Sequence, residues 1–189
     1  MARNYTLKRR AESQAETRQR IVEAAVELHS TIGPASTTVS MIAEKAGVQR
    51  NTFYAHFPDE WDMVMACSGH VMDSDPLPDP EPWASAIAPQ DRLQTGLRAI
   101  YNWYERQEGL LGCVLRDAEH HELTRKITDF RFSAPMARYA EVLGAKLKAK
   151  QRAMLTLALS FHTWRTLARE AGLKQADIVK AMTAAILAA

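Results

Sequence analysis

Apolar residues recur at helical spacing along most of this chain of 189 residues. Near the N-terminus, four of them share one helical face, and Gly33-Pro34 ends the pattern. These four are Ile21, Ala25, Leu28 and Ile32. The chain has no alternating apolar and polar run of useful length, which a half-buried β-strand would require. The spacing therefore predicts an all-α fold.

Residues 37–57 predict two short helices joined by a tight turn. Hydroxyl side chains stand just before the first helix, where they can accept a hydrogen bond from an unpaired backbone N–H. Gly47 is expected to end this helix, because glycine lets the chain reverse without a clash of Cβ. The second helix is expected over 49–56, with Phe53 and Phe57 as its apolar contacts.

An acidic, proline-rich stretch over 73–91 predicts a linker, and we place a domain boundary at its start. Apolar spacing predicts further helices beyond it, at about 110–116, 122–147, 151–171 and 174–189. Pro135 is expected to kink or split the second of these.

Charge is unevenly distributed, although the net charge is only +2. The first twenty residues hold six basic and two acidic side chains, and Arg3, Lys8, Arg9 and Arg10 lead this segment. A basic N-terminal arm suits an anionic partner such as DNA or a membrane surface, and a solvated tail is the alternative.

Cys67 and Cys113 lie far apart without the spacing of a zinc module or a disulfide framework. His120-His121 does not predict a metal site, because adjacent helical residues point about 100° apart. No metal or cofactor is therefore expected. With no apolar run of membrane-spanning length and no secretory signal, the expected location is the cytoplasm.

The arrangement over 37–57 has the physical logic of a helix-turn-helix. Its second helix projects polar side chains outward, where they can enter the major groove of double-stranded DNA. Arginine can donate two hydrogen bonds to guanine, and glutamine or asparagine can pair with adenine. The outward set is Gln49, Arg50, Asn51, Thr52 and Tyr54.

The segment "RIVEAAVELHSTIG", the turn unit "TTVSMIAEKAGV" and the ending "TFYAHF" together resemble the DNA-binding domain of the TetR family of bacterial transcriptional regulators. The resemblance covers 14–74. It implies a three-helix DNA-binding domain followed by a helical bundle over 91–189 that binds a ligand and dimerises.

With the resemblance, the expected DNA-contacting residues are Thr37, Thr38, Gln49, Arg50, Asn51, Thr52, Tyr54 and His56. Tyr54 and His56 would serve chiefly the phosphates, and the start of the second short helix would serve the bases. Three positions depart from the family pattern. His29 replaces a frequent aromatic residue, Gln49 a frequent serine, and Glu60 a common phosphate-contacting lysine.

The C-terminal part carries no motif of its own. The resemblance implies a homodimer formed through the last two long helices, and their apolar residues fit this: Leu155, Leu159, Trp164, Ile178, Met182 and Ile186. The alternative is that they close the core of a single chain. Several residues could line an apolar effector pocket or simply pack the core. They are Trp103, Tyr104, Phe130, Phe161 and His162, with Phe132 and Met136 beside them.

The sequence thus predicts a DNA-binding transcriptional regulator, a repressor released from its operator by a small molecule. An enzyme or carrier with an incidental helix-turn-helix would need a catalytic constellation, and none is found. An architectural nucleic-acid binder would not need the long C-terminal half. The effector, the operator and the regulated genes cannot be read from the residues.

Overall fold

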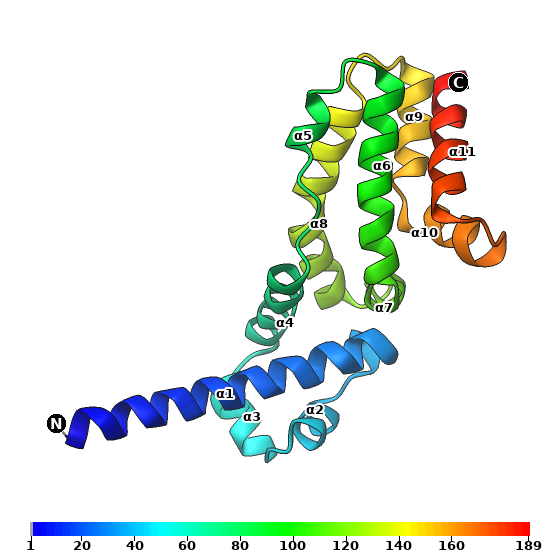
Figure 1. Ribbon diagram of the computed structural model, residues 1–189. Coiled ribbons are helices and arrows are strands. Elements are labelled where there is room, and N and C mark those ends of the chain that lie inside the picture. Colours follow the sequence, from blue (N-terminus) through cyan, green and yellow to red (C-terminus); the bar gives the residue numbers. More distant parts are fainter. Residues whose placement is uncertain (1) are drawn as a thin grey trace. The chain divides into compact units, whose positions relative to one another are not determined.

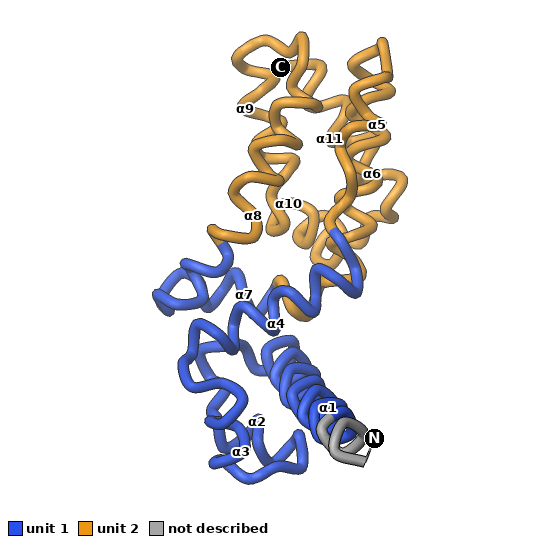
Figure 2. Tube along the Cα trace, turned by 90° about the vertical axis from the view of Figure 1, so that its left-hand side faces the viewer, with its two compact units in different colours: residues 1–76, 112–128 blue, residues 77–111, 129–189 orange. Residues whose placement is uncertain are grey.

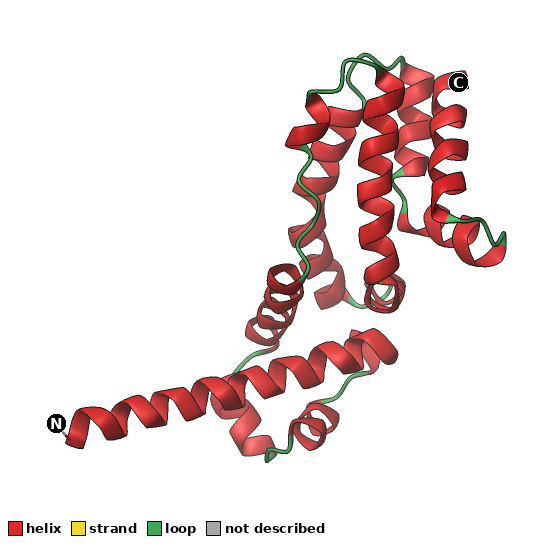
Figure 3. Cartoon of the chain, viewed as in Figure 1, coloured by secondary structure: helices red, strands yellow, loops and turns green. Residues whose placement is uncertain are grey.

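The computed structural model describes residues 2–189, with side chains described from Lys8 onward. Within this range every regular element is helical, which confirms the all-α prediction (Figures 1 and 3). The α-helices are α1 (Ala2–Thr31), α2 (Val39–Ala46), α3 (Arg50–His56), α4 (Glu60–Ser74), α5 (Glu81–Ala84), α6 (Pro89–Arg106), α7 (Glu108–Ala118), α8 (Glu122–Leu143), α9 (Ala149–Ala158), α10 (Phe161–Arg165) and α11 (Gln175–Ala188). A 3₁₀ turn, η1 (Pro34–Ser36), follows α1, and a π-helical turn, η2 (Thr166–Glu170), follows α10. None of the described helices is both long and apolar enough to cross a lipid bilayer.

The chain divides into two compact units, coloured separately in Figure 2. Unit 1 comprises residues 1–76 and 112–128, and unit 2 comprises residues 77–111 and 129–189. The division differs from the expected domains over 14–74 and 91–189, because residues 112–128 group with the N-terminal helices and unit 2 already begins at Leu77.

The core of unit 1 is formed by the predicted apolar face of α1 together with α2, α3 and α4. Its buried members include Ile21, Ala25, Ile42, Ala46, Phe53, Phe57, Met63 and Cys67. On the surface, the ammonium group of Lys45 lies 2.6 Å from the carboxylate of Glu27 and links α2 to α1. The helix α1 extends well before Ile21, the first residue of the predicted apolar face, because it already begins at Ala2. The basic N-terminal arm is therefore part of α1, and the side chain of Arg3 lies outside the described residues.

The connection between α1 and α2 is held by the end of α7. The backbone N–H of Ala35 donates to the buried carboxylate of Asp117 over 2.9 Å, and the guanidinium of Arg116 donates to the carbonyl of Ile32 over 3.0 Å. Arg116 also donates to Asp117 over 2.8 Å. These bonds explain why residues 112–128 group with the N-terminal helices.

Gly33 and Gly47 both adopt positive φ, 94° and 65°, but Gly47 has the left-handed helical ψ of 39° whereas Gly33 has a ψ of 156°, a conformation that essentially only glycine adopts. A Cβ at Gly33 would meet the Asp117 carboxylate and the Arg116 guanidinium, whereas a Cβ at Gly47 would meet no atom within 4 Å. We expect Gly47→Ala to lower the free energy of unfolding by about 1 kcal/mol and Gly33→Ala by at least about 2 kcal/mol. Urea unfolding followed by circular dichroism measures both. Equal losses would show that Gly33 is not closely packed.

Unit 2 is built on α6, which packs against α11, while α11 also packs against α9. Aromatic side chains fill this core, and two of them bond to backbone. The hydroxyl of Tyr101 donates to the carbonyl of Ala158 over 2.8 Å, and that of Tyr104 donates to the carbonyl of Leu159 over 2.6 Å. Both carbonyls lie where α9 stops before α10. The single helix expected over 151–171 is therefore wrong, because the chain breaks at this point and the two tyrosines satisfy the exposed carbonyls.

Two other expectations need correction. The stretch over 73–91 is not an open linker: Trp83 on α5 is buried beside the ring of Tyr139, with 5.2 Å between ring centroids. The hydroxyl of Tyr139 also donates to the carbonyl of Pro78 over 2.6 Å. Pro135 does not split its helix, since α8 is continuous from Glu122 to Leu143.

The six apolar side chains expected to pair two copies of the chain are all buried within one chain. None is more than 9% exposed, and Trp164, Ile178 and Ile186 are 0% exposed. These side chains therefore close the core of unit 2, which was the alternative to a dimer interface. They do not support a dimer, which needs other surface residues.

Candidate nucleic-acid interface

The turn between α2 and α3 is fixed by backbone and side-chain hydrogen bonds. The hydroxyl of Thr38 accepts from the backbone N–H of Met41 over 3.2 Å and so caps the start of α2. At the other end, Gly47 takes the left-handed conformation and the N–H of Val48 donates to the carbonyl of Ala43 over 2.9 Å. This geometry sets the direction in which α3 leaves α2.

α3 has one buried anchor and an exposed polar face. Phe53 is 4% exposed and packs edge-on against Tyr54, with 5.6 Å between ring centroids. Three polar residues at the start of α3 are exposed: Gln49, Arg50 and Asn51. Gln49 is the N-cap residue, but its side chain makes no capping bond. The structure thus gathers these three side chains at one exposed helix end, where their donors and acceptors face outward.

The other expected DNA contacts are more restricted. Tyr54 is 46% exposed, whereas Thr52 and His56 are half-buried. The hydroxyl of Thr37 donates to the carbonyl of Gly33 over 2.7 Å, and that of Thr38 serves as the helix cap. Both threonines therefore shape the start of α2 as well as standing beside the exposed face.

The start of α4 carries acidic side chains at the edge of this surface. Asp59, Glu60 and Asp62 are exposed, and the carboxylate of Asp59 accepts from the N–H of Asp62 over 2.7 Å. Trp61, which follows Glu60, is 41% exposed although it is a large apolar side chain. A basic group lies nearby on α1: the guanidinium of Arg18 stacks over the ring of Phe57 at 4.1 Å.

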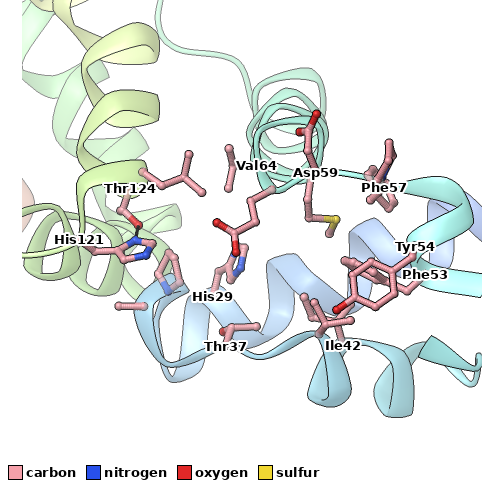
Figure 4. Close-up of a pocket in the computed structure, with 17 residues that line it drawn as sticks. His29, Thr37, Ile42, Phe53, Tyr54, Phe57, Asp59, Val64, His121 and Thr124 are labelled. Carbon is pink, nitrogen blue, oxygen red and sulfur yellow. Dashed lines mark hydrogen bonds between the residues drawn. The ribbon is translucent and has the colours of Figure 1, made fainter. Parts of the chain in front are cut away.

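A pocket of about 480 Å³ lies within unit 1 beside this surface (Figure 4). Its apolar lining is contributed by Ile42, Phe53, Phe57, Met63, Val64 and Leu123. Figure 4 shows His121 and Thr124 on one side and Phe53 and Tyr54 on the other, with His29 between them. The ring of His121 and the hydroxyl of Thr124 are hydrogen-bonded over 2.7 Å. The pocket was not predicted, because residues 121–124 are distant in sequence from α3.

His29 is the one departure in α1 that the pocket explains. Burial lowers the pKa of its imidazole to about 4, and the charge of Asp117 opposes this shift only in part. The side chain is therefore neutral at neutral pH, and it contributes polarity to the pocket without charge.

The residues predicted to bind an effector differ in their burial. Trp103, Tyr104 and Phe161 are buried in the aromatic core of unit 2, with 5.6 Å between the ring centroids of Tyr104 and Phe161. Phe130 is 58% exposed, and His162 is exposed with its ring edge against Phe161. The three buried rings pack against one another, so their observed contacts are those of a core.

The N-terminal region is similar in sequence to known transcriptional regulators. The profile of the family described as bacterial regulatory proteins, tetR family, matches residues 21–66. The chain is 40% identical over 67 residues to the HTH-type transcriptional regulator SrpR of Pseudomonas putida, and the match covers 34% of this chain and 32% of that protein. It is 46% identical over 48 residues to the HTH-type transcriptional regulator AcrR of Shigella flexneri, and this match covers 25% of this chain and 22% of that protein. The match thus spans a third or less of either relative.

Solved structures resemble the fold over most of the chain. A TetR-like transcriptional regulator from Rhodococcus sp. RHA1 has a TM-score of 0.65 at 17% identity and covers 91% of this chain and 96% of its own. NalD of Pseudomonas aeruginosa, the secondary repressor of the MexAB-OprM multidrug efflux pump, has a TM-score of 0.58 at 20% identity. The match covers 92% of this chain and 96% of NalD. At these identities the similarity establishes the fold.

Proposed function

We propose that this chain, whose residues 21–66 match the profile of the tetR family of bacterial regulatory proteins, represses transcription by binding a specific DNA operator. In this proposal a small molecule releases the repressor from the operator. The proteins it resembles by sequence are transcriptional regulators rather than enzymes.

The observation that carries the proposal is the exposed start of α3. Gln49, Arg50 and Asn51 stand together there, while Phe53 anchors the helix to the core from its other face. An arginine and two amide side chains at the first turn of a recognition helix can read base edges in the major groove. Tyr54 and His56 lie further along and are assigned to the phosphates.

We propose further that the protein acts as a homodimer in the cytoplasm. One short helix reads too few base pairs to bind tightly, so two copies would supply two half-sites. Since the apolar residues of α9 and α11 named above are buried, the interface would have to use exposed ones such as Leu157, which is 50% exposed.

The experiment is selection of DNA from a random library, followed by gel shifts with the selected sequence and with the DNA flanking the gene. A regulator selects one recurrent, two-fold symmetric motif. An architectural binder retains DNA without a motif, and an enzyme or carrier retains none. Only the first result supports the proposal.

A further inference from the structure

The pocket of unit 1 is large enough for a small organic molecule and is bordered by the helix assigned to DNA. Its volume of about 480 Å³ lies within the usual range of ligand pockets, about 300–1,000 Å³. Ile42, Phe53 and Phe57 on its apolar side are each no more than 4% exposed. Tyr54, Asp59 and Glu60 also line it and are exposed, so solvent reaches the pocket on their side.

Charge decides which class of ligand fits. Asp59 and Glu60 contribute carboxylates to the lining, and among the described residues no lysine or arginine lines the pocket. Both histidines of the lining are part-buried, and burial keeps the pKa of His29 low, so this ring adds no positive charge. The carboxylate of Asp59 also caps α4, and both carboxylates are exposed, so they add a modest preference for a cation over an anion at the open side of the pocket.

The aromatic lining adds a second preference for cations. Phe53 and Tyr54 contribute to it, whereas the ring of Phe57 already carries the guanidinium of Arg18 at 4.1 Å. The face of an aromatic ring attracts an organic cation, quaternary ammonium groups in particular. Buried apolar side chains beside these rings would accept the aliphatic or aromatic body of such a ligand.

We propose that this pocket binds a small organic cation with an apolar body, and that the bound cation competes with DNA for the side chain of Tyr54. The second part rests on the proposed function, because it requires Tyr54 to contact DNA. The first part does not. Tyr54 both lines the pocket and stands on the exposed face of α3, and one side chain cannot hold a ligand and a phosphate in different positions at once.

The binding arm uses the full chain without DNA and three probes: benzyltrimethylammonium, benzyl alcohol and phenylacetate. Titration is followed by amide chemical shifts in nuclear magnetic resonance. We expect the cation to shift residues around the pocket and to bind about tenfold more tightly than the neutral alcohol, with no saturable binding of the anion. Equal binding of the three probes, or no shift at the pocket, would overturn the site.

Variants test whether the pocket is responsible. Glu60→Gln is expected to weaken cation binding about threefold, since its carboxylate is exposed and screened. Asp62→Asn removes the same charge from the same helical turn at a residue outside the lining, and it should leave the affinity unchanged. Val64→Phe and Ala35→Leu each fill the pocket from a different element and should abolish binding. If one of them does not fold, the other decides. Wild-type cation affinity in a folded filling variant would contradict the proposal.

The competition arm measures fluorescence anisotropy of the selected DNA. Saturating benzyltrimethylammonium chloride should weaken DNA binding at least about fivefold, whereas sodium chloride at the same concentration controls for ionic strength. If the chain binds the cation but no DNA, the proposed function is wrong and the proposed cation site still holds. Cation binding that leaves DNA affinity unchanged would overturn the competition.

Discussion

Replacing Trp164 with glutamate is expected to unfold unit 2 rather than to separate two folded subunits. The Trp164 side chain is 0% exposed, its ring packs against Tyr104 and Phe161, and its indole N–H donates to the amide oxygen of Gln175 over 2.9 Å. A glutamate there would bury an unpaired carboxylate and leave a cavity, which costs more than about 4 kcal/mol. Such a loss approaches the whole stability of a small domain.

Circular dichroism and analytical ultracentrifugation of the same sample check this expectation. The variant should lose helix content and a cooperative thermal transition, or aggregate. Ile87→Glu is the matched control, because Ile87 lies in unit 2, is 87% exposed, and the same change there leaves the core intact. A folded Trp164→Glu monomer with wild-type stability would show instead that Trp164 belongs to a subunit interface.

Replacing Glu60 with lysine is expected to tighten DNA binding about tenfold, equally on specific and unrelated sequences. The exposed carboxylate stands at the start of α4, where the family often has a lysine that contacts a phosphate. The substitution removes a repulsion and adds one phosphate contact, so the slope of log affinity against log salt should steepen by about 0.9. Titrations at several salt concentrations measure both quantities.

Asp177→Lys on α11 provides the control for this substitution. It changes the net charge by the same amount and also lies in the first turn of a helix, so both variants bear a similar unfavourable interaction with the helix dipole. An equal gain in the two variants would mean that only overall charge matters. Glu60 would then lie away from the phosphates.

The helix-turn-helix could be predicted from the sequence because its signals are local. Thr38 caps the helix that follows it, and Gly47 takes positive φ within the turn that it ends. Phe53 faces inward at the spacing expected from its neighbours. Each of these depends on residues within one or two helical turns, so the pattern contains the necessary information.

The unit boundary could not be predicted in the same way. Asp117 accepts from the N–H of Ala35, a residue 82 positions earlier, and nothing near Asp117 indicates this partner. The same holds for Trp83, whose burial beside Tyr139 turns an apparent linker into part of the core. Proline content predicted a linker here and missed both the helix α5 and this long-range contact.

Apolar periodicity also could not decide between a dimer interface and a core. Ile178 and Ile186 occupy one face of α11 in either case, and only the position of α6 and α9 shows that this face is already covered. The break between α9 and α10 has a similar origin, because it is stabilised by the hydroxyls of Tyr101 and Tyr104 from another helix.

The most direct test of the central claim, that the start of α3 reads DNA bases, compares Arg50→Ala with Tyr54→Phe. Each variant is titrated with the selected DNA and with a scrambled sequence at one fixed salt concentration. Arg50→Ala should lose about 1–3 kcal/mol on the selected DNA only and relax the preference at one base pair. Tyr54→Phe should lose about 1 kcal/mol on both DNAs. An equal loss on both DNAs for Arg50→Ala would contradict the account, because Arg50 would then contact a phosphate rather than a base.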